Sequence, residues 1–275
     1  MIDFKDQTIL VFGVASEDSI AWGICQTLAK AGAKLILGYQ PRYRSRLLQL
    51  QKSLPAIEGL YPIDVATEEG VQNFFREFSL HHSHCKAHAL VHSIAFSPRE
   101  TFDRSSLFAT QEAIDLTLTI SAHSLQRLLR LALPHLVPGS STVTLTYLAA
   151  QRWVPAYRVM AIAKAALGCW VRELACELGA DGHRVNAISS GPMKTLASTG
   201  IPGIETILAH VERNAPLRRN ITQEEVAGAA LWLLSDLASG VTGQIIYVDA
   251  GYSIIAVPGA IREEPCHLSR LPLWE

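Results

Sequence analysis

Two tyrosines and a lysine fall within one short stretch, residues 146–164, which reads TYLAAQRWVPAYRVMAIAK. Tyr157 and Lys164 are seven residues apart, and seven steps of about 100° return a helical side chain to nearly the same face. A phenol and an ammonium on one helix face, with Tyr147 at the end of the preceding β-branched run, can stabilise a developing oxyanion. The stretch alone also allows a half-buried helix tyrosine and a solvated lysine without a chemical role.

The rest of the chain predicts the elements that would position this stretch. Short apolar runs alternate with helical segments about seven times, and no linker or shift in composition divides them. This pattern predicts an α/β fold, a Rossmann-like doubly wound seven-stranded parallel sheet in a single domain of residues 1–257, followed by a loosely packed tail, residues 258–275. The predicted strands are residues 8–12, 34–38, 59–63, 87–92, 141–146, 184–188 and 244–248. The predicted helices are residues 20–31, 42–53, 68–79, 110–133, 159–178 and 223–234.

A glycine turn, GVASEDSIAWG, joins the first predicted strand directly to a helix. Backbone N–H groups at such a turn, together with the helix dipole, favour the pyrophosphate of a dinucleotide. Gly13 is followed by Ser19, Ala21 and Gly23, a spacing that departs from GxGxxG. The glycines could therefore also serve only the turn.

The ends of the second and third strands concern the adenosine half of a dinucleotide. An acid after the second strand suits the ribose of NAD, and an arginine suits the 2′-phosphate of NADP. No acid follows that strand, but Arg42, Arg44 and Arg46 do, and they could meet a phosphate or form a solvated helix face. After the third strand, Asp64 could accept a hydrogen bond from adenine or cap a helix.

Two further segments carry small residues. Residues 93–95 follow the fourth strand, where backbone would pass close to a cofactor. Residues 193–207, MKTLASTGIPGIETI, are small and moderately apolar, and we expect a flexible lid over a substrate.

Composition narrows the function classes. The 275 residues are 49% hydrophobic and 18% charged, which is enough for a sizeable core, and the net charge of -1 predicts no nucleic-acid partner. No apolar run reaches the length of a membrane helix and no signal-peptide pattern is present, so we expect a cytoplasmic protein without a membrane partner. The five cysteines form no CxxC pair, which predicts reduced thiols. Residues 81–85, HHSHC, lack a second ligand cluster at finger spacing, so no metal site is predicted.

With these pieces placed, the chain resembles the divergent short-chain dehydrogenase/reductases, specifically the NADH-type enoyl-acyl-carrier-protein reductases. The matching segments, which end near residue 256, are GVASEDSIAWGICQTLAKAGA, YPIDVA, LVHSIAF, VTLTYLAAQRWVPAYRVMAIAKAAL, RVNAISSGPMKTLAS and APLRRNITQEEVAGAALWLLSDLASGVTGQIIYVDAGYSI. The glycine loop has Gly13, Ser19 and Ala21 where ordinary members have TGxxxGxG. The tyrosine precedes the lysine by seven positions rather than four, and Met160 stands where an ordinary member needs its tyrosine.

The resemblance implies reduction of the trans-2 double bond of enoyl-acyl-carrier-protein thioesters by nicotinamide hydride, the last step of the type II fatty-acid elongation cycle. Negative charge would develop on the thioester oxygen, which then needs a donor. The resemblance assigns that donor role to Tyr157, the nicotinamide ribose to Lys164, and the mouth of the acyl pocket to Tyr147. The implied substrate-binding residues are Ala95, Tyr147, Tyr157 and Met160.

The implied cofactor is NADH, with NADPH possible, because Gln40 resembles the glutamine of NADH-using members. The implied cofactor-binding residues are Gly13, Ala15, Ser19, Ile20, Gln40, Asp64, Val65, Ser93, Ile94, Ala95, Lys164, Met193 and Thr195. The implied partners are acyl carrier protein carrying the enoyl thioester and further copies of the chain in a homotetramer, through helices 110–133 and 159–178 and the last strand. A buried core stripe on those helices would give the same pattern.

Two alternatives remain open on the sequence. One is a short-chain reductase acting on a carbonyl, which Thr146 and Met160 disfavour because carbonyl reduction in the ordinary family uses a serine and a four-spaced tyrosine. The other is a diverged nucleotide-binding relative without turnover. Residues 148–150 and 156–158 allow this alternative, because they depart from the residues usual in the family at these positions. Turnover of an enoyl thioester, compared with a 3-oxoacyl thioester, distinguishes these possibilities.

Overall fold

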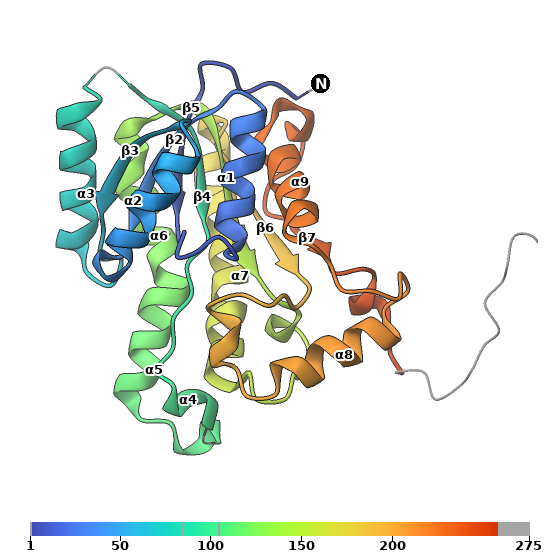
Figure 1. The fold of residues 1–275 in the computed structure, drawn as a ribbon. Coiled ribbons are helices and arrows are strands. Elements are labelled where there is room, and N and C mark those ends of the chain that lie inside the picture. The colour runs from blue at the N-terminus through green and yellow to red at the C-terminus, as the bar shows by residue number, and fades with distance from the viewer. Residues whose placement is uncertain (1, 84, 104, 258–275) are drawn as a thin grey trace, which may run out of the picture.

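The structure, a computed structural model, describes residues 2–83, 85–103 and 105–257. Seven parallel strands form one sheet in the order β3-β2-β1-β4-β5-β6-β7 (Figure 1). The strands are β1 Thr8–Phe12, β2 Lys34–Tyr39, β3 Ile57–Pro62, β4 Ala87–His92, β5 Leu136–Thr146, β6 Arg184–Ser190 and β7 Ile245–Val248. The predicted doubly wound α/β fold is confirmed. The predicted tail, residues 258–275, lies outside the described residues.

Nine α-helices lie in the described part of the chain, and six of them cover the sheet. The helices are α1 Ile20–Lys30, α2 Arg44–Ser53, α3 Glu68–His81, α4 Glu100–Asp103, α5 Gln111–Leu118, α6 Ser124–Ala132, α7 Arg158–Leu178, α8 Ile204–Asn214 and α9 Gln223–Leu234. Helices α1, α2 and α9 pack on one face, and α3, α6 and α7 pack on the other. Helices α4, α5 and α8 extend beyond the sheet at the end where the strands finish (Figure 1).

The residues of β1 show why the sheet is buried on both faces. All five of its residues are buried, and each is branched or aromatic, which suits a central parallel strand. Ile9 and Val11 join the apolar cluster under α1, α2 and α9, whereas Leu10 and Phe12 join the cluster under α3, α6 and α7. The period of two along a strand therefore divides one apolar run between two cores.

The strand order reverses between β1 and β4. Strand β1 pairs with β2 on one side and with β4 on the other, both in parallel. Connections leave this point toward opposite edges of the sheet, so a crevice opens beyond the carboxyl ends of β1 and β4. This is the place where an open α/β sheet binds its ligand.

Several predicted boundaries differ from the structure. Strand β5 begins at Leu136 rather than at residue 141, because Leu136 already pairs with Ala87 of β4 before a register shift at Gly139, whose φ is 76°. The single predicted helix 110–133 is interrupted by a π-helical turn, Thr119–His123, between α5 and α6. The prediction of a flexible segment over 193–207 is wrong from residue 204 onward, where α8 begins. The short helix α4 was not predicted.

Candidate active site

The loop after β1 meets the end of β4 in close backbone contact. The Ser93 N–H donates to the Phe12 carbonyl at 2.9 Å, and Gly13 has a φ of +105°. A Cβ at residue 13 would lie 2.0 Å from the Ser93 carbonyl oxygen. Residue 13 must therefore be a glycine, both because of its positive φ and because a Cβ would clash with Ser93. Two predicted cofactor residues, Gly13 and Ser93, lie side by side.

Gly13→Ala is expected to lower the free energy of unfolding by at least about 2 kcal/mol, because strain and a backbone clash coincide. Gly228→Ala is the matched control, since Gly228 lies in α9 with nothing within 4 Å of its added Cβ. The control should be neutral or stabilising by up to about 1 kcal/mol. Urea unfolding of both variants measures the difference, and equal stabilities would contradict this account of Gly13.

The N-terminus of α1 is open to an anion. Ser19 is the N-cap, but its hydroxyl donates to the Ser16 carbonyl at 2.6 Å and caps no helix N–H, and the first turn holds no acid. In contrast, α3 and α9 have capping threonines and two acids each in their first turns. Ile20 is the first residue of α1. The free N–H groups and the helix dipole at this end suit a pyrophosphate.

Two of the residues predicted at the adenosine, Gln40 and Asp64, lie just after β2 and β3. Gln40 is exposed directly after β2. Asp64 is also exposed, and its Oδ1 accepts the Ala66 N–H at 2.9 Å. Thr67, not Asp64, caps α3, so the capping alternative for Asp64 is wrong. The Val65 carbonyl is held by Arg127 at 2.6 Å.

Two of the three arginines after β2 contact neighbouring loops. The Arg46 Nη1 donates to the Ala15 carbonyl at 3.0 Å, in the loop between β1 and α1. The Arg42 guanidinium lies 4.7 Å from the Tyr43 ring centre and 5.9 Å from that of Phe96. Arg42 and Arg46 are therefore engaged across the mouth of the crevice rather than forming only a solvated helix face.

The two tyrosine rings contact each other just after β5, and Lys164 is held against the end of that strand. The rings of Tyr147 and Tyr157 lie with centroids 4.9 Å apart, inclined at 54°. Lys164 is only 5% exposed, and its Nζ donates to the Leu145 carbonyl at 2.7 Å. The structure thus brings two phenols together and holds an ammonium against the strand that carries the first of them. Donors of this kind can stabilise an oxyanion.

Burial shifts the pKa values of all three groups. It raises the pKa of Tyr147 to about 12, with smaller contributions from Tyr252 and Asp249. It raises the pKa of Tyr157 further above its usual range, with a smaller contribution from Tyr147. It lowers the pKa of Lys164 to about 8. Both phenols therefore keep their protons at neutral pH and can act as donors.

Tyr157 lies just outside the helix that was expected to contain it. Helix α7 begins at Arg158, and Tyr157 occupies the N-cap position with a φ of -78°. Its neighbours Ala156 and Arg158 have φ values of 62° and 47°, which are strained for residues other than glycine. The prediction of one continuous helix face is wrong at this residue, and strained backbone on both sides sets the direction of Tyr157.

Met160 forms part of an apolar wall beside Tyr157. It clusters with Phe102 and Ala163, and the partly buried Tyr157 and Ile201 pack against this group. Such a wall suits an acyl chain, the role predicted for Met160. Of the other predicted residues, Ala95 is exposed, Ile94 packs against the core beneath α3 and α6, and Met193 packs against the opposite core.

Thr195 belongs to a segment that is fastened to α8. The Thr195 N–H donates to the Ser198 hydroxyl at 2.8 Å, and the Ser198 N–H donates back to the Thr195 hydroxyl at 3.1 Å. Lys194 pairs with Glu205 at 2.8 Å, at the start of α8. The residues after β6 are thus tied to the helix that overhangs the carboxyl end of the sheet.

Sequence reasoning missed the residues that the π-helical turn brings to the site. The Ser121 hydroxyl donates to the Phe96 carbonyl at 2.7 Å and accepts the Phe96 N–H at 2.9 Å. Ser121 therefore holds both the N–H and the carbonyl of Phe96, in the segment after β4. No pattern in the sequence marks Ser121, because the π turn that directs it depends on packing rather than on a local motif.

His92 forms a second unpredicted link, between β4, β5 and the same turn. Its Nε2 and Nδ1 lie 2.8 Å from the hydroxyls of Ser124 and Thr144. The Ser124 hydroxyl donates its proton to the Ile120 carbonyl at 2.6 Å, so His92 must carry its proton on Nε2 and accept from Thr144 at Nδ1. Burial, and then the charge of Lys164, lower the pKa of His92 to about 3. His92 is therefore neutral at pH 7, so it adds no second positive charge that would repel Lys164.

The family follows from comparison with known proteins. A family model described as Enoyl-(Acyl carrier protein) reductase matches residues 13–253. The chain belongs to this family. This chain is 42% identical to the NADH-type reductase FabI of Haemophilus influenzae over 258 residues, which cover 93% of this chain and 97% of that protein. It is 40% identical to the NADPH-type FabI of Staphylococcus aureus over 264 residues, 93% of this chain and 100% of that protein.

Solved structures agree with the family. The Bacillus cereus enoyl-acyl carrier protein reductase with NADP+ and an indole naphthyridinone superposes with a TM-score of 0.89 at 40% identity, covering 94% of this chain and 100% of that chain. The Anaplasma phagocytophilum reductase in complex with NAD gives a TM-score of 0.88 at 36% identity, covering 93% of this chain and 97% of that chain. The family expected from the sequence is confirmed.

The described residues also bear on metal binding and on membrane insertion. Among those residues, which omit His84 of the HHSHC segment, no group of three or more metal-ligand side chains comes together. No helix within the described ranges is long and apolar enough to cross a membrane.

The pKa of Lys164 predicts a pH dependence for this reductase. A pKa lowered from 10.5 to about 8 means that the ammonium is present below pH 7 and is lost as the pH rises through 8. Because the resemblance assigns the nicotinamide ribose to Lys164, the kcat/KM for the dinucleotide should fall about tenfold per pH unit above 8. Between pH 8 and the unfolded pKa of 10.5, Lys164 is protonated in the unfolded chain but neutral in the folded protein. The destabilisation caused by burying its charge is relieved over this range, so the free energy of unfolding rises with pH.

Initial rates between pH 6 and 10, at low dinucleotide concentration, measure this profile. Lys164→Arg is the control, because a guanidinium keeps its charge throughout this range. A profile that stays flat up to pH 10 in the unsubstituted enzyme would contradict the role of the Lys164 charge.

Proposed function

We propose that Tyr157, Lys164 and Tyr147 carry out the activity of the family in this chain, the reduction of the trans-2 double bond of enoyl-acyl-carrier-protein thioesters. The observation that supports this proposal is the contact of the two tyrosine rings, 4.9 Å apart, at the carboxyl end of β5, the strand whose Leu145 carbonyl holds the buried Lys164. A bound nicotinamide dinucleotide would supply the hydride for the β-carbon of the substrate. The chain's own residues then have to stabilise the charge that moves to the thioester oxygen.

Tyr157 is the proposed donor to that oxygen. Its raised pKa keeps the phenol protonated, so it donates a hydrogen bond rather than presenting a charge. Lys164 would bind the nicotinamide ribose hydroxyls and add positive charge on the same side. Tyr147 would stand at the mouth of the acyl pocket, with Met160 and Ala95 along its wall.

Two observations support a dinucleotide in the crevice. Gly13 lets the loop after β1 lie against the Ser93 backbone, which a Cβ would prevent, and α1 presents an uncapped N-terminus without an acid. We propose Gly13, Ala15, Ser19 and Ile20 at the pyrophosphate. Gln40, Asp64 and Val65 are proposed at the adenosine, and Ser93, Ile94, Ala95, Lys164, Met193 and Thr195 toward the nicotinamide. The family uses NADH, and some members use NADPH.

The partner and setting are also proposals. Acyl carrier protein is the proposed carrier of the substrate, and a homotetramer is the proposed assembly. The edge strand β7 is only half buried along its length, and Leu116 and Ile162 are exposed apolar residues on the proposed contact helices, which supports contacts between copies. The four cysteines in the described ranges are free thiols, which supports a reducing, cytoplasmic setting.

Purified protein should oxidise NADH, followed at 340 nm, with crotonyl or longer enoyl thioesters, and NADPH is tested in parallel. A 3-oxoacyl thioester is the control substrate. Preference for the 3-oxoacyl thioester would favour a carbonyl reductase. Dinucleotide binding without turnover of either substrate would overturn the reductase assignment and favour a binding relative.

A further inference from the structure

The N-terminal turn of α9 reaches the loop that leads into α1. The Gln223 Nε2 donates to the carbonyl of Glu17 at 3.0 Å and also to the carbonyl of Ser19, the N-cap of α1. Helices α1 and α9 lie side by side in Figure 1, although about 200 residues separate them in the chain. One amide group thus holds two carbonyls of the loop between β1 and α1.

Gly23 makes room for this amide. A Cβ at residue 23 would lie 2.4 Å from Cγ and 2.8 Å from Cδ of Gln223, and no other side chain is among its nearest neighbours. Glycine within a helix is otherwise unfavourable, so a specific approach explains its presence in α1. Gly23 therefore accommodates the stem of Gln223 rather than the pyrophosphate itself.

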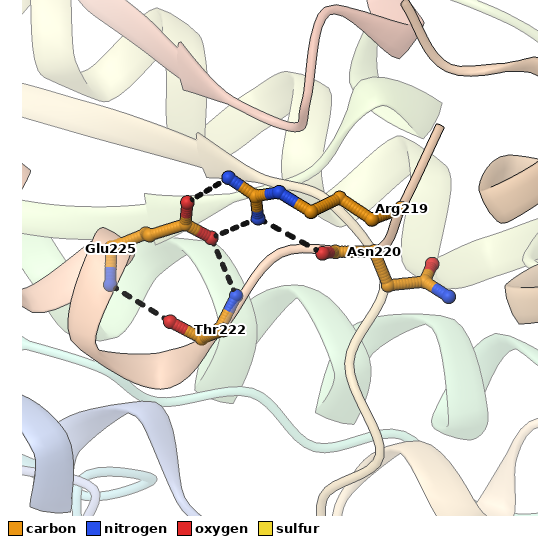
Figure 2. A network of polar contacts seen from close by, with 4 residues as sticks. All are labelled: Arg219, Asn220, Thr222 and Glu225. Atoms are coloured by element: carbon orange, nitrogen blue, oxygen red, sulfur yellow. Dashed lines mark hydrogen bonds and ion pairs between the residues drawn. The ribbon is translucent and has the colours of Figure 1, made fainter. Parts of the chain in front are cut away.

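A polar network keeps the turn that carries Gln223 in place (Figure 2). Arg219 pairs with both carboxylate oxygens of Glu225, at 2.9 and 2.5 Å. Glu225 Oε2 accepts the Thr222 N–H at 2.8 Å, and the Thr222 hydroxyl accepts the Glu225 N–H at 3.3 Å. The Arg219 charge and hydrogen bonds lower the pKa of Glu225, so this carboxylate stays ionised.

The same segment also holds α8. The Asn220 Nδ2 donates to the Leu208 carbonyl at 3.1 Å. Residues 219–225 therefore contact the overhanging helix with one side chain and the loop before α1 with another. Gln223 is supported on both sides of its turn, which makes it a rigid donor for the loop carbonyls.

We infer that Gln223 is a positioning residue for the dinucleotide pyrophosphate, an inference that rests on the proposed placement of the dinucleotide at the start of α1. By holding the Glu17 and Ser19 carbonyls away from the crevice, Gln223 orients the peptide units so that the free N–H groups of α1 face the anion. Such preorganisation strengthens binding without taking part in the chemical step. Its loss should raise the dinucleotide Kd and KM and leave kcat and the KM for the enoyl thioester unchanged.

Gln223→Met tests the inference, because methionine fills nearly the same volume but donates no hydrogen bond. The dinucleotide Kd, measured directly by NADH fluorescence titration, should rise about three- to tenfold. The kcat at saturating NADH should stay within about twofold, since a positioning role does not touch the reacting atoms. Glu224→Ala is the matched control from the same turn, because its side chain is exposed.

A double substitution separates positioning from general damage. Gly23→Ala should displace the Gln223 side chain and raise the NADH Kd about as much as Gln223→Met. In a Gln223→Ala background the same Gly23→Ala change meets no clash, so it should not weaken binding further and should raise Tm by about 2–4 °C. If the two residues only supported the fold, Gly23→Ala would change Tm alone and leave the NADH Kd unchanged in both backgrounds.

The outcomes distinguish this inference from the proposed function. If the unsubstituted protein bound neither NADH nor NADPH, the proposed function would fail. If it bound NADH and Gln223→Met bound it equally well, only the inference would fail. A loss confined to kcat in Gln223→Met would also overturn the positioning role.

Discussion

Replacing Tyr157 by phenylalanine is expected to lower kcat for enoyl thioester reduction on the order of 10²-fold, the loss typical of removing one oxyanion donor. The substitution removes a single oxygen from a partly buried ring that packs against Tyr147 and Met160, so the fold should be preserved. The dinucleotide Kd should stay unchanged, because the phenol is proposed to act only on the thioester oxygen. Steady-state rates at saturating NADH, with Kd from fluorescence titration, measure both quantities.

Tyr147→Phe is the matched control for this experiment. Its ring lies 4.9 Å from that of Tyr157, and burial likewise raises its pKa, so it matches in chemistry and surroundings. If Tyr157 is the direct donor, Tyr147→Phe should reduce kcat less than tenfold and act mainly on the KM for the enoyl thioester. The reverse ranking would transfer the donor role to Tyr147.

Lys164→Met is expected to reduce kcat/KM for the dinucleotide by about 10²- to 10³-fold. The substitution removes an ammonium that would bind two ribose hydroxyls and stabilise nearby negative charge, and charge-assisted hydrogen bonds are the stronger kind. Stability should move in the opposite direction. Because burial lowers the pKa of Lys164, the charged form is unfavourable in the folded protein, and methionine should leave Tm no lower than before.

The combination of lost activity and retained Tm is the diagnostic result for Lys164. Lys30→Met, on the last turn of α1, controls for the loss of one positive charge and should leave kcat/KM within about twofold. A Lys164→Met variant with an unchanged dinucleotide Kd would contradict the ribose-binding role. A strongly reduced Tm would show that the hydrogen bond to the Leu145 carbonyl outweighs the unfavourable burial of charge.

Much of the fold could be predicted because its signals are local. The apolar run of β1 ends at a glycine, and Thr222, the N-cap of α9, is followed three residues later by Glu225, a capping box that the structure contains. The bounds of β1, β4 and α9 were predicted as they occur. The crevice followed from the alternation of strands and helices, which allows few topologies.

The parts that could not be predicted depend on contacts between distant residues. Ser121 reaches Phe96 only because a π turn adds a residue to the helix, and no pattern in the sequence TISAH predicts this turn. Helix α8 was missed because the glycines and prolines before it resemble a loop. Gln223 resembles any solvent-facing helix residue until α1 is placed beside it.

The bond between Gln223 and Ser19 joins residues that are 204 positions apart, which has a consequence during synthesis. A ribosome adding about 5–20 residues per second needs roughly 10–40 s to travel between them. Throughout that interval the nascent loop has its strand and its helix but lacks the amide that fixes it. The binding crevice is therefore completed late in translation, and a partly made chain presents it only in a loose form.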